Sequence, residues 1–120
     1  MSSPDNLTNT GPLAGIRVID LTRVLSGPFC SMMLGDMGAE VIKIERPSAG
    51  DDTRAFAPPY QGEESAYFLS VNRNKKSLAL DMKQDAAKEV LWKLVENADV
   101  IIENFRPGAA ARLGFGYKDV

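Results

Sequence analysis

Histidine is absent from this chain of 120 residues, and cysteine is represented only by Cys30. Catalytic triads of the Ser-His-Asp type need a histidine base, and imidazole is a usual ligand of protein-bound zinc. We therefore exclude those triads and expect no metal in the functional site. A lone cysteine also excludes a disulfide within the chain, and its place on an apolar helical stretch favours a packing role.

A strong charge of one sign and a long hydrophobic run are missing as well. The formal net charge is −2, which gives no electrostatic reason to expect nucleic acid as a partner. The longest stretch without a charged residue, residues 24–35, is too short to span a bilayer, so we expect no membrane partner. The remaining composition, 44% hydrophobic and 25% charged residues, is that of an ordinary globular domain.

The first 12 residues, MSSPDNLTNTGP, are polar and rich in residues that break regular structure. They lack the apolar core of a signal peptide and the arginines of a transit peptide. We predict a disordered tail over residues 1–12 and a folded region over residues 13–120. The expected location is the cytoplasm, with the mitochondrial matrix left open for a eukaryotic protein.

Residues 15–46 have the clearest pattern, which predicts a strand, a turn, a helix and a second strand. Apolar, β-branched runs over residues 16–21 and 41–44 are typical of buried parallel strands. The turn between them has a single glycine and is not the GxGxxG turn of dinucleotide-binding proteins. Arg46 lies 20 positions after Ser26, where an arginine accommodates a phosphate. This favours a phosphorylated ligand other than NAD, with a plain surface arginine as the alternative.

The rest of the chain continues the alternation of strands and helices. A loop over residues 47–61 precedes a short helix over 64–71, a strand over 77–81, an amphipathic helix that ends near residue 98, a strand over 99–104 and a short helix over 109–113. Asp81 and Gln84 form a pattern typical of a capping box at the start of the long helix. The alternation predicts an α/β fold with a doubly wound, mainly parallel, Rossmann-like sheet.

Polar or cationic residues follow each predicted strand, at residues 23–26, 46, 81–83 and 104–106. In open parallel sheets, ligands bind outside the carboxyl ends of the strands, so we predict a ligand site at this edge. The segment NRNKK, residues 72–76, also places three cations beside a strand start, which indicates either an anionic ligand or a charged turn. The charges of the 47–61 loop are expected to be solvated, with ligand contacts from Arg54 and Tyr60 as the alternative.

Four segments, GIRVIDLTRVLSGPF, LGDMGAEVIKIERPSAGDDTR, NRNKKSLALDMK and DVIIENFRPG, follow one another along residues 13–120. In sequence and order they resemble the N-terminal part of the class III CoA-transferases, the CaiB/BaiF type. Within that family, GDDTR and SVNRNKK most resemble the succinyl-CoA:glutarate type, and the formyl-CoA:oxalate type is also similar. The resemblance implies that the chain is an incomplete, N-terminal portion of the family's large domain.

The resemblance implies a coenzyme A site at the strand ends. The family's first turn contacts CoA at the positions of Leu25 and Ser26, and Leu25 stands where the formyl-CoA enzyme has a glutamine. The family arginine that meets the adenosine-phosphate end of CoA matches Arg46. Arg106 follows the matching Asn-Phe pair, where the formyl-CoA enzyme has glycine. The other implied contacts to CoA are Leu80, Asp81, Met82, Lys83, Asn104, Phe105 and Arg112.

The resemblance also implies what this chain does not contain. Family members use an aspartate nucleophile that attacks the thioester; it lies beyond Val120, so we assign no catalytic residue here. The implied function is transfer of CoA from an acyl-CoA to a free carboxylic acid, by a longer protein of which this chain is a fragment. That full-length protein is expected to form an interlocked homodimer. Two alternatives stay open: an acyl-CoA racemase of the same family, and a non-catalytic nucleotide-binding module.

Overall fold

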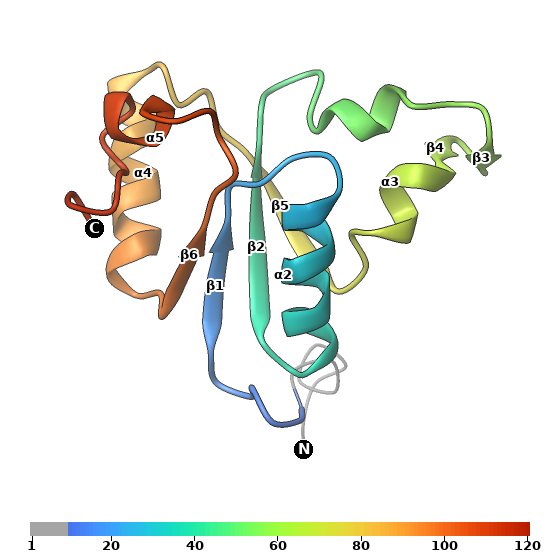
Figure 1. Ribbon diagram of the computed structural model, residues 1–120, viewed down its shortest axis with the longest axis horizontal. Helices are drawn as coiled ribbons and strands as arrows, with labels where there is room; N and C mark the ends of the chain where they lie inside the picture. Colours follow the sequence, from blue (N-terminus) through green and yellow to red (C-terminus); the bar gives the residue numbers. More distant parts are fainter. Residues whose placement is uncertain (1–9) are drawn as a thin grey trace.

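A parallel four-stranded sheet forms the centre of the computed structural model, which describes residues 10–120 (Figure 1). Its strand order is β5-β2-β1-β6, and every neighbouring pair runs parallel. The strands are β1 (Arg17–Asp20), β2 (Glu40–Glu45), β5 (Lys75–Ala79) and β6 (Val100–Ile102). The helices beside them are α2 (Ser26–Asp36), α4 (Asp85–Glu96) and α5 (Ala109–Arg112).

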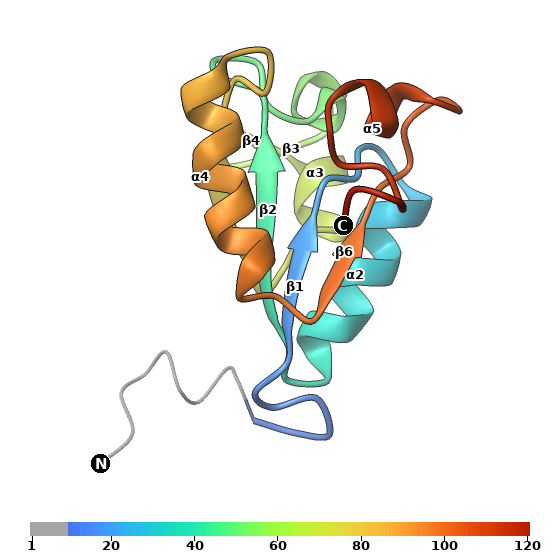
Figure 2. The ribbon, with the colours of Figure 1, turned by 90° about the vertical axis from the view of Figure 1, so that its left-hand side faces the viewer.

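Helices cover both faces of this sheet, with α4 on one side and α2 on the other (Figure 2). Side chains alternate along a strand, so Val18 and Ile19 of β1 are both fully buried but belong to different cores. Burying an aliphatic side chain of this size contributes about 1.5–3 kcal/mol. The buried core on the α4 side consists of Ile19, Leu21, Ile44, Leu91, Val95 and Phe115, and that on the α2 side of Val18, Ala39 and Val41. The predicted α/β fold with a parallel sheet covered on both faces is confirmed.

The connection from β2 to β5 forms a small unit beside the sheet (Figure 1). It contains a 3₁₀ helix, η1 (Asp52–Ala55), the antiparallel pair of β3 (Tyr60–Gln61) and β4 (Glu64–Ser65), and α3 (Ala66–Ser70). The helix predicted over residues 64–71 is confirmed for its central part, and Ser65 caps it by accepting a hydrogen bond from the Phe68 N–H at 3.3 Å.

The third predicted strand is displaced toward the N-terminus. It begins at Lys75 and not at residue 77, because its ladder to β2 already includes Lys75.

The predicted capping box of Asp81 and Gln84 is wrong, since the long helix begins at residue 85 with Gln84 as its N-cap and without a side-chain cap. The Asp81 carboxylate instead accepts hydrogen bonds from the Lys83 N–H and the Gln84 amide, which stabilises the turn before α4.

The fourth strand is shorter than predicted because polar side chains beyond its two ends bond to the backbone of β1 and of the turn that follows β1. Asp99 accepts a hydrogen bond from the Arg17 N–H at 2.9 Å, and Asn104 bonds to the backbone of Arg23. β6 thus covers only the central part of residues 99–104.

The predicted tail over residues 1–12 lies largely outside the described residues. Of its last three residues, Gly11 accepts a hydrogen bond from the Ala14 N–H at 3.1 Å. Within residues 10–120, none of the helices has the length and apolar character needed to cross a membrane.

Candidate functional site

A cavity of about 600 Å³ lies at the carboxyl ends of the strands. Eight of the predicted site residues line it: Arg46, Leu80, Asp81, Met82, Lys83, Phe105, Arg106 and Arg112. Leu25, Ser26 and Asn104 do not line it. Residues from four distant segments therefore meet at one edge, as expected where parallel strands end together.

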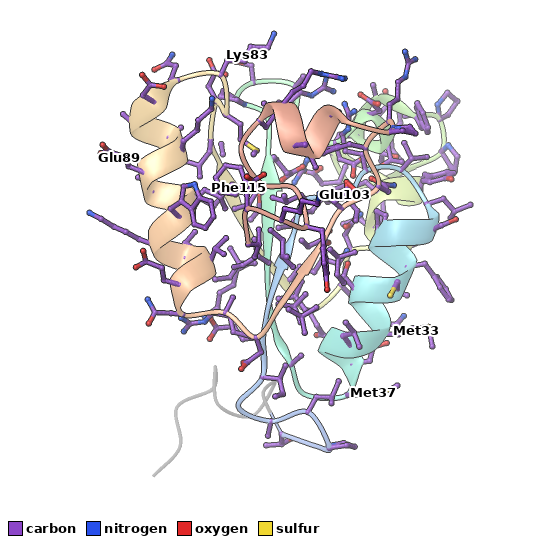
Figure 3. All side chains as sticks on the ribbon, turned by 60° about the vertical axis from the view of Figure 1, so that its left-hand side comes forward. Met33, Met37, Lys83, Glu89, Glu103 and Phe115 are labelled. Atoms are coloured by element: carbon purple, nitrogen blue, oxygen red, sulfur yellow. The ribbon has the colours of Figure 1, made fainter. Side chains whose placement is uncertain are left out.

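The wall of this cavity combines apolar surface with cations. Apolar surface comes from Leu21, Ile44, Leu80, Met82, Phe105 and Leu113. The Arg23 guanidinium lies over the Phe105 ring, 5.9 Å from its centroid, which is within the range of a cation–π contact. In Figure 3, Lys83 extends from the upper edge of the molecule, beyond the strand ends.

Several of the cations at the cavity form no ion pair with any residue that the structure describes. Among residues 10–120, no ion pair involves Lys83, Arg106 or Arg112. Arg46 differs, because its half-exposed guanidinium pairs with Asp52 and donates to the Gly50 carbonyl at 3.1 Å. Unpaired cations that surround a partly apolar cavity favour an anionic ligand.

Asn104 acts on the cavity indirectly. Its Oδ1 accepts a hydrogen bond from the Arg23 N–H at 3.1 Å, and its Nδ2 donates to the Arg23 carbonyl at 2.9 Å. The amide thus ties the end of β6 to the turn that follows β1. Leu25 and Ser26 lie further along that turn, where Leu25 is 48% exposed and Ser26 begins α2.

A buried ion pair that the sequence did not reveal lies at the cavity. The Nζ of Lys43 is 2.9 Å from Oδ2 of Asp51, and the two side chains are 1% and 0% exposed. Lys43 Nζ also donates to the Thr22 carbonyl at 2.9 Å. The prediction that the charges of the 47–61 loop are solvated is therefore wrong for Asp51. Lys43 was the available signal, because an ammonium group inside an apolar buried strand needs a partner.

A second buried pair joins β1 to β5. Lys75 Nζ lies 3.1 Å from Oδ2 of Asp20, and both side chains are almost fully buried. Asp20 also accepts hydrogen bonds from the Thr22 N–H at 2.8 Å and from Ser31 Oγ at 2.6 Å. Since Thr22 in turn accepts from Lys43, the two pairs form one network that runs under the end of β1.

The cations of residues 72–76 are all paired with carboxylates. Lys75 pairs with Asp20, Arg73 Nη2 lies 2.7 Å from Oδ2 of Asp36, and Lys76 Nζ lies 3.9 Å from Oε2 of Glu40. None of them lines the cavity. The structure thus favours the alternative in which this segment is a charged turn that leads into a strand.

Glu45 connects the small 47–71 unit to the end of β2. Burial raises the pKa of this carboxyl, but hydrogen bonds from Arg54, Ser77 and the Asp51 N–H outweigh burial and lower the pKa to about 2. Arg54 donates from Nε and Nη2 to the two carboxylate oxygens at 2.8 Å each, a bidentate arrangement. Its guanidinium also lies 3.8 Å from the centroid of the Phe68 ring. Arg54 is therefore engaged in holding the structure together.

Within the buried network, burial shifts the pKa values of Asp51 and Lys75 in opposite directions. For Asp51, burial raises the pKa, but the Thr53 N–H and the Lys43 ammonium outweigh it, so the pKa lies below its usual value. For Lys75, loss of solvent lowers the pKa and the nearby Asp20 carboxylate offsets this only in part.

Known proteins share both the sequence and the fold of this chain. Residues 13–120 match the model of the family described as CoA-transferase family III. The chain is 52% identical over 115 residues to the succinyl-CoA:glutarate CoA-transferase of Homo sapiens, an alignment that covers 96% of this chain and 26% of that protein. It is 50% identical over 110 residues to the acetyl-CoA:oxalate CoA-transferase of Acetobacter aceti, covering 92% of this chain and 28% of that one.

A solved structure supports the same relationship. The crystal structure of a CaiB/BaiF family protein from Brucella suis matches with a TM-score of 0.85 and 42% identity, over 91% of this chain and 30% of that chain. The chain therefore spans only 26–30% of the length of these relatives. The resemblance inferred from the four sequence segments is confirmed, and the chain belongs to CoA-transferase family III.

Proposed function

We propose that this chain is the coenzyme A-binding part of a longer CoA-transferase, which moves CoA from an acyl-CoA to a free carboxylic acid. The observation that carries the proposal is the cavity at the strand ends, lined by Lys83, Arg106 and Arg112, which form no ion pair within residues 10–120. CoA presents several phosphate groups next to a flat adenine base. A cationic wall with adjoining apolar surface complements both parts of such a molecule.

Each predicted contact has a role in this proposal. Arg46 takes the 3′-phosphate end of CoA, because its ion pair with Asp52 is half exposed and can be exchanged at little cost. Lys83, Arg106 and Arg112 contact the diphosphate.

The remaining residues surround the base and the first turn. Leu80, Met82 and Phe105 supply the apolar surface for adenine, beside the turn that contains Asp81. Leu25 and Ser26 contact CoA from the β1–α2 turn, and Asn104 holds that turn in place through Arg23.

The chemical step is proposed to need an aspartate beyond Val120. Its carboxylate attacks the thioester carbonyl, the CoA thiolate leaves, and a mixed anhydride forms. The thiolate then attacks the aspartyl carbonyl of the anhydride, which releases the first carboxylic acid and leaves an aspartyl-CoA thioester. The second acid reverses these steps and departs as the new acyl-CoA. This chain would keep CoA bound throughout, so that the freed thiolate stays beside the anhydride. For the full-length protein we also propose a homodimer, on the basis of its family.

Calorimetric titration of the 120-residue chain with CoA and with 3′-dephospho-CoA tests the binding part of the proposal. We expect Arg46→Ala to weaken CoA binding by roughly 1.5–3 kcal/mol, the range of a hydrogen bond to a charged group. Because Arg46 is assigned to the 3′-phosphate, the same substitution should barely affect 3′-dephospho-CoA. The matched control is Arg17→Ala, which removes an arginine paired with Glu40 at the opposite edge of the sheet. Equal losses for both ligands would contradict the assignment of Arg46.

The reaction is tested on the full-length protein with a labelled acyl-CoA and a free acid. Movement of CoA to the acid supports the transferase. Exchange of the α-proton of the acyl group without any acceptor acid would support the racemase alternative and overturn the proposal.

A further inference from the structure

We propose that Asp51 is a positioning residue, which holds the turn between β1 and α2 in the conformation that contacts CoA. This inference rests on the proposed function, since it concerns the same site. The carboxylate of Asp51 accepts a hydrogen bond from the Val24 N–H, whose nitrogen lies 3.2 Å from Oδ1 and 3.3 Å from Oδ2. Asp51 belongs to the loop after β2, so this contact joins two loops that lie far apart in the sequence.

The turn that Asp51 holds has an unfavourable backbone conformation. Val24 has a φ of 74°, in the left-handed region that a β-branched residue rarely adopts. Such a conformation persists only where the surrounding structure enforces it, and it is found mainly at functional sites. The turn is enforced from three sides: Asp20 binds Thr22, Asn104 binds Arg23, and Asp51 binds Val24.

The segments joined by Asp51 both border the cavity. Thr22 and Arg23 line it on the β1 side, and Arg46 and Gly50 line it on the β2 side. At the start of α2, a side chain on Gly27 would collide with Thr22, so the turn also packs closely against the helix that follows. A shift of Asp51 would therefore move both walls of the cavity relative to each other.

Stability alone is a poor explanation for this arrangement. A buried ion pair such as Lys43–Asp51 loses so much solvation that apolar residues of similar volume often stabilise a protein at least as well. A pair of this kind is better explained by the single conformation that it imposes. Lys43 contributes by donating to both Asp51 and the Thr22 carbonyl, which holds the two loops at a constant separation.

Two double variants separate positioning from stability. Lys43→Met/Asp51→Asn and Lys43→Met/Asp51→Ala both remove the ion pair without leaving a buried charge unpaired. Only the first keeps an oxygen that can accept the Val24 N–H. For each variant we would measure CoA affinity by calorimetry, Tm by thermal unfolding, and hydrogen exchange of the Val24 amide by NMR.

The proposal predicts that the asparagine variant binds CoA about tenfold or more tightly than the alanine variant, a difference of about 1.4 kcal/mol or more. It also predicts faster exchange of the Val24 amide in the alanine variant. Equal CoA affinities in two folded variants, or equal protection of the Val24 amide, would overturn it.

A third variant keeps the test decisive if the alanine variant unfolds too readily. Adding Val24→Gly to Lys43→Met/Asp51→Ala removes the cost of the left-handed backbone, because glycine adopts positive φ freely. We expect Tm to rise while CoA binding stays about tenfold or more weaker than in the asparagine variant. Recovery of affinity together with Tm would show that Asp51 acts only through stability.

The test also distinguishes failure of this inference from failure of the proposed function. If the unsubstituted chain does not bind CoA, the proposed function fails for this chain. The exchange rates of the Val24 amide in the two double variants still report whether Asp51 holds the turn.

Discussion

The two edges of the sheet, the amino edge where the strands begin and the carboxyl edge where they end, differ in how their cations are paired. At the amino edge, Arg17 and Lys76 share Glu40, at 2.8 and 3.9 Å, and Arg73 pairs with Asp36 at 2.7 Å. At the carboxyl edge, Lys83, Arg106 and Arg112 surround a cavity of about 600 Å³ and form no ion pair within residues 10–120. Among the described residues, only the buried Lys43 and the half-exposed Arg46 of this cavity lining pair with carboxylates, those of Asp51 and Asp52. The number of cations in a segment therefore does not identify a ligand site. The site is identified better by the position of its cations relative to the direction of the strands, and by their lack of an acidic partner in the described part of the chain.

The largest difference between the edges is expected in the unfolding free energy that is lost when one charge of an ion pair is removed. Lys43→Met leaves Asp51 buried and unpaired at the carboxyl edge, which typically costs about 3–5 kcal/mol of unfolding free energy. Arg17→Ala removes a more exposed pair at the amino edge and should cost less than about 1 kcal/mol. Urea denaturation of both variants measures this. Similar losses of unfolding free energy in the two variants would show that the buried pair contributes no more to stability than the exposed one.

Acid should lower the unfolding free energy of the protein by protonating Glu45 at the carboxyl edge. The carboxyl of Glu45 has a folded-state pKa of about 2, below its ordinary value of 4.5. A lowered carboxylate pKa contributes stability that is fully present above about pH 4.5 and is lost as the pH falls toward 2. With a side chain only 5% exposed, the contribution is about 3 kcal/mol.

Unfolding measured between pH 6 and pH 2, in roughly half-unit steps, checks this for the unsubstituted chain and for Glu45→Gln. The glutamine variant should be less stable at neutral pH and should lose less stability on acidification. The control is Asp36→Asn at the amino edge. Arg73 lowers the pKa of the Asp36 carboxyl too, but this group is near the surface, so its removal should change the acid dependence little. An unchanged acid profile in the glutamine variant would contradict the prediction.

Removing an arginine from each edge should affect the free energy of CoA binding differently, by less than the loss of stability expected for Lys43→Met. Arg112→Ala should weaken CoA binding by roughly 1.5–3 kcal/mol, because it removes from the cavity wall a cation that forms no ion pair among residues 10–120. It should also reduce the salt dependence of binding, since one ionic contact is lost. Arg73→Ala, at the amino edge, should leave both quantities unchanged. Titrations at two salt concentrations compare the variants, and an equal effect of Arg73→Ala would break the distinction between the edges.

The fold could be predicted because the sequence patterns of its first two strands are local. The apolar, β-branched residues of β1 and β2 indicate buried strands whatever lies around them, and the breaks after them place the strand ends at one edge. Eight of the residues that line the cavity were predicted as site residues, some from the strand ends and others from the family resemblance alone. The start of β5 was missed because Lys75 reads as part of a charged turn, and only its tertiary contact with Asp20 explains how it enters a sheet.

The buried network could not be predicted from local pattern. Lys43 and Asp51 are separated by the turn after β2, and nothing in the intervening residues shows that the chain returns to place them 2.9 Å apart. The ligand contact predicted for Asn104 stays a prediction, but the bonds of its amide to the backbone of Arg23 could not be foreseen. Such roles depend on which segments meet in space, and sequence spacing does not contain that information.

The most direct test of the proposed CoA site is a map of NMR chemical-shift changes on adding CoA to the 120-residue chain. We predict that the changes cluster at the carboxyl edge, in residues 21–26, 46–51, 80–83 and 104–113, with little change in residues 36–40 and 72–76. Changes centred on the amino edge, or none at saturating CoA, would contradict the assignment of the cavity as the coenzyme A site.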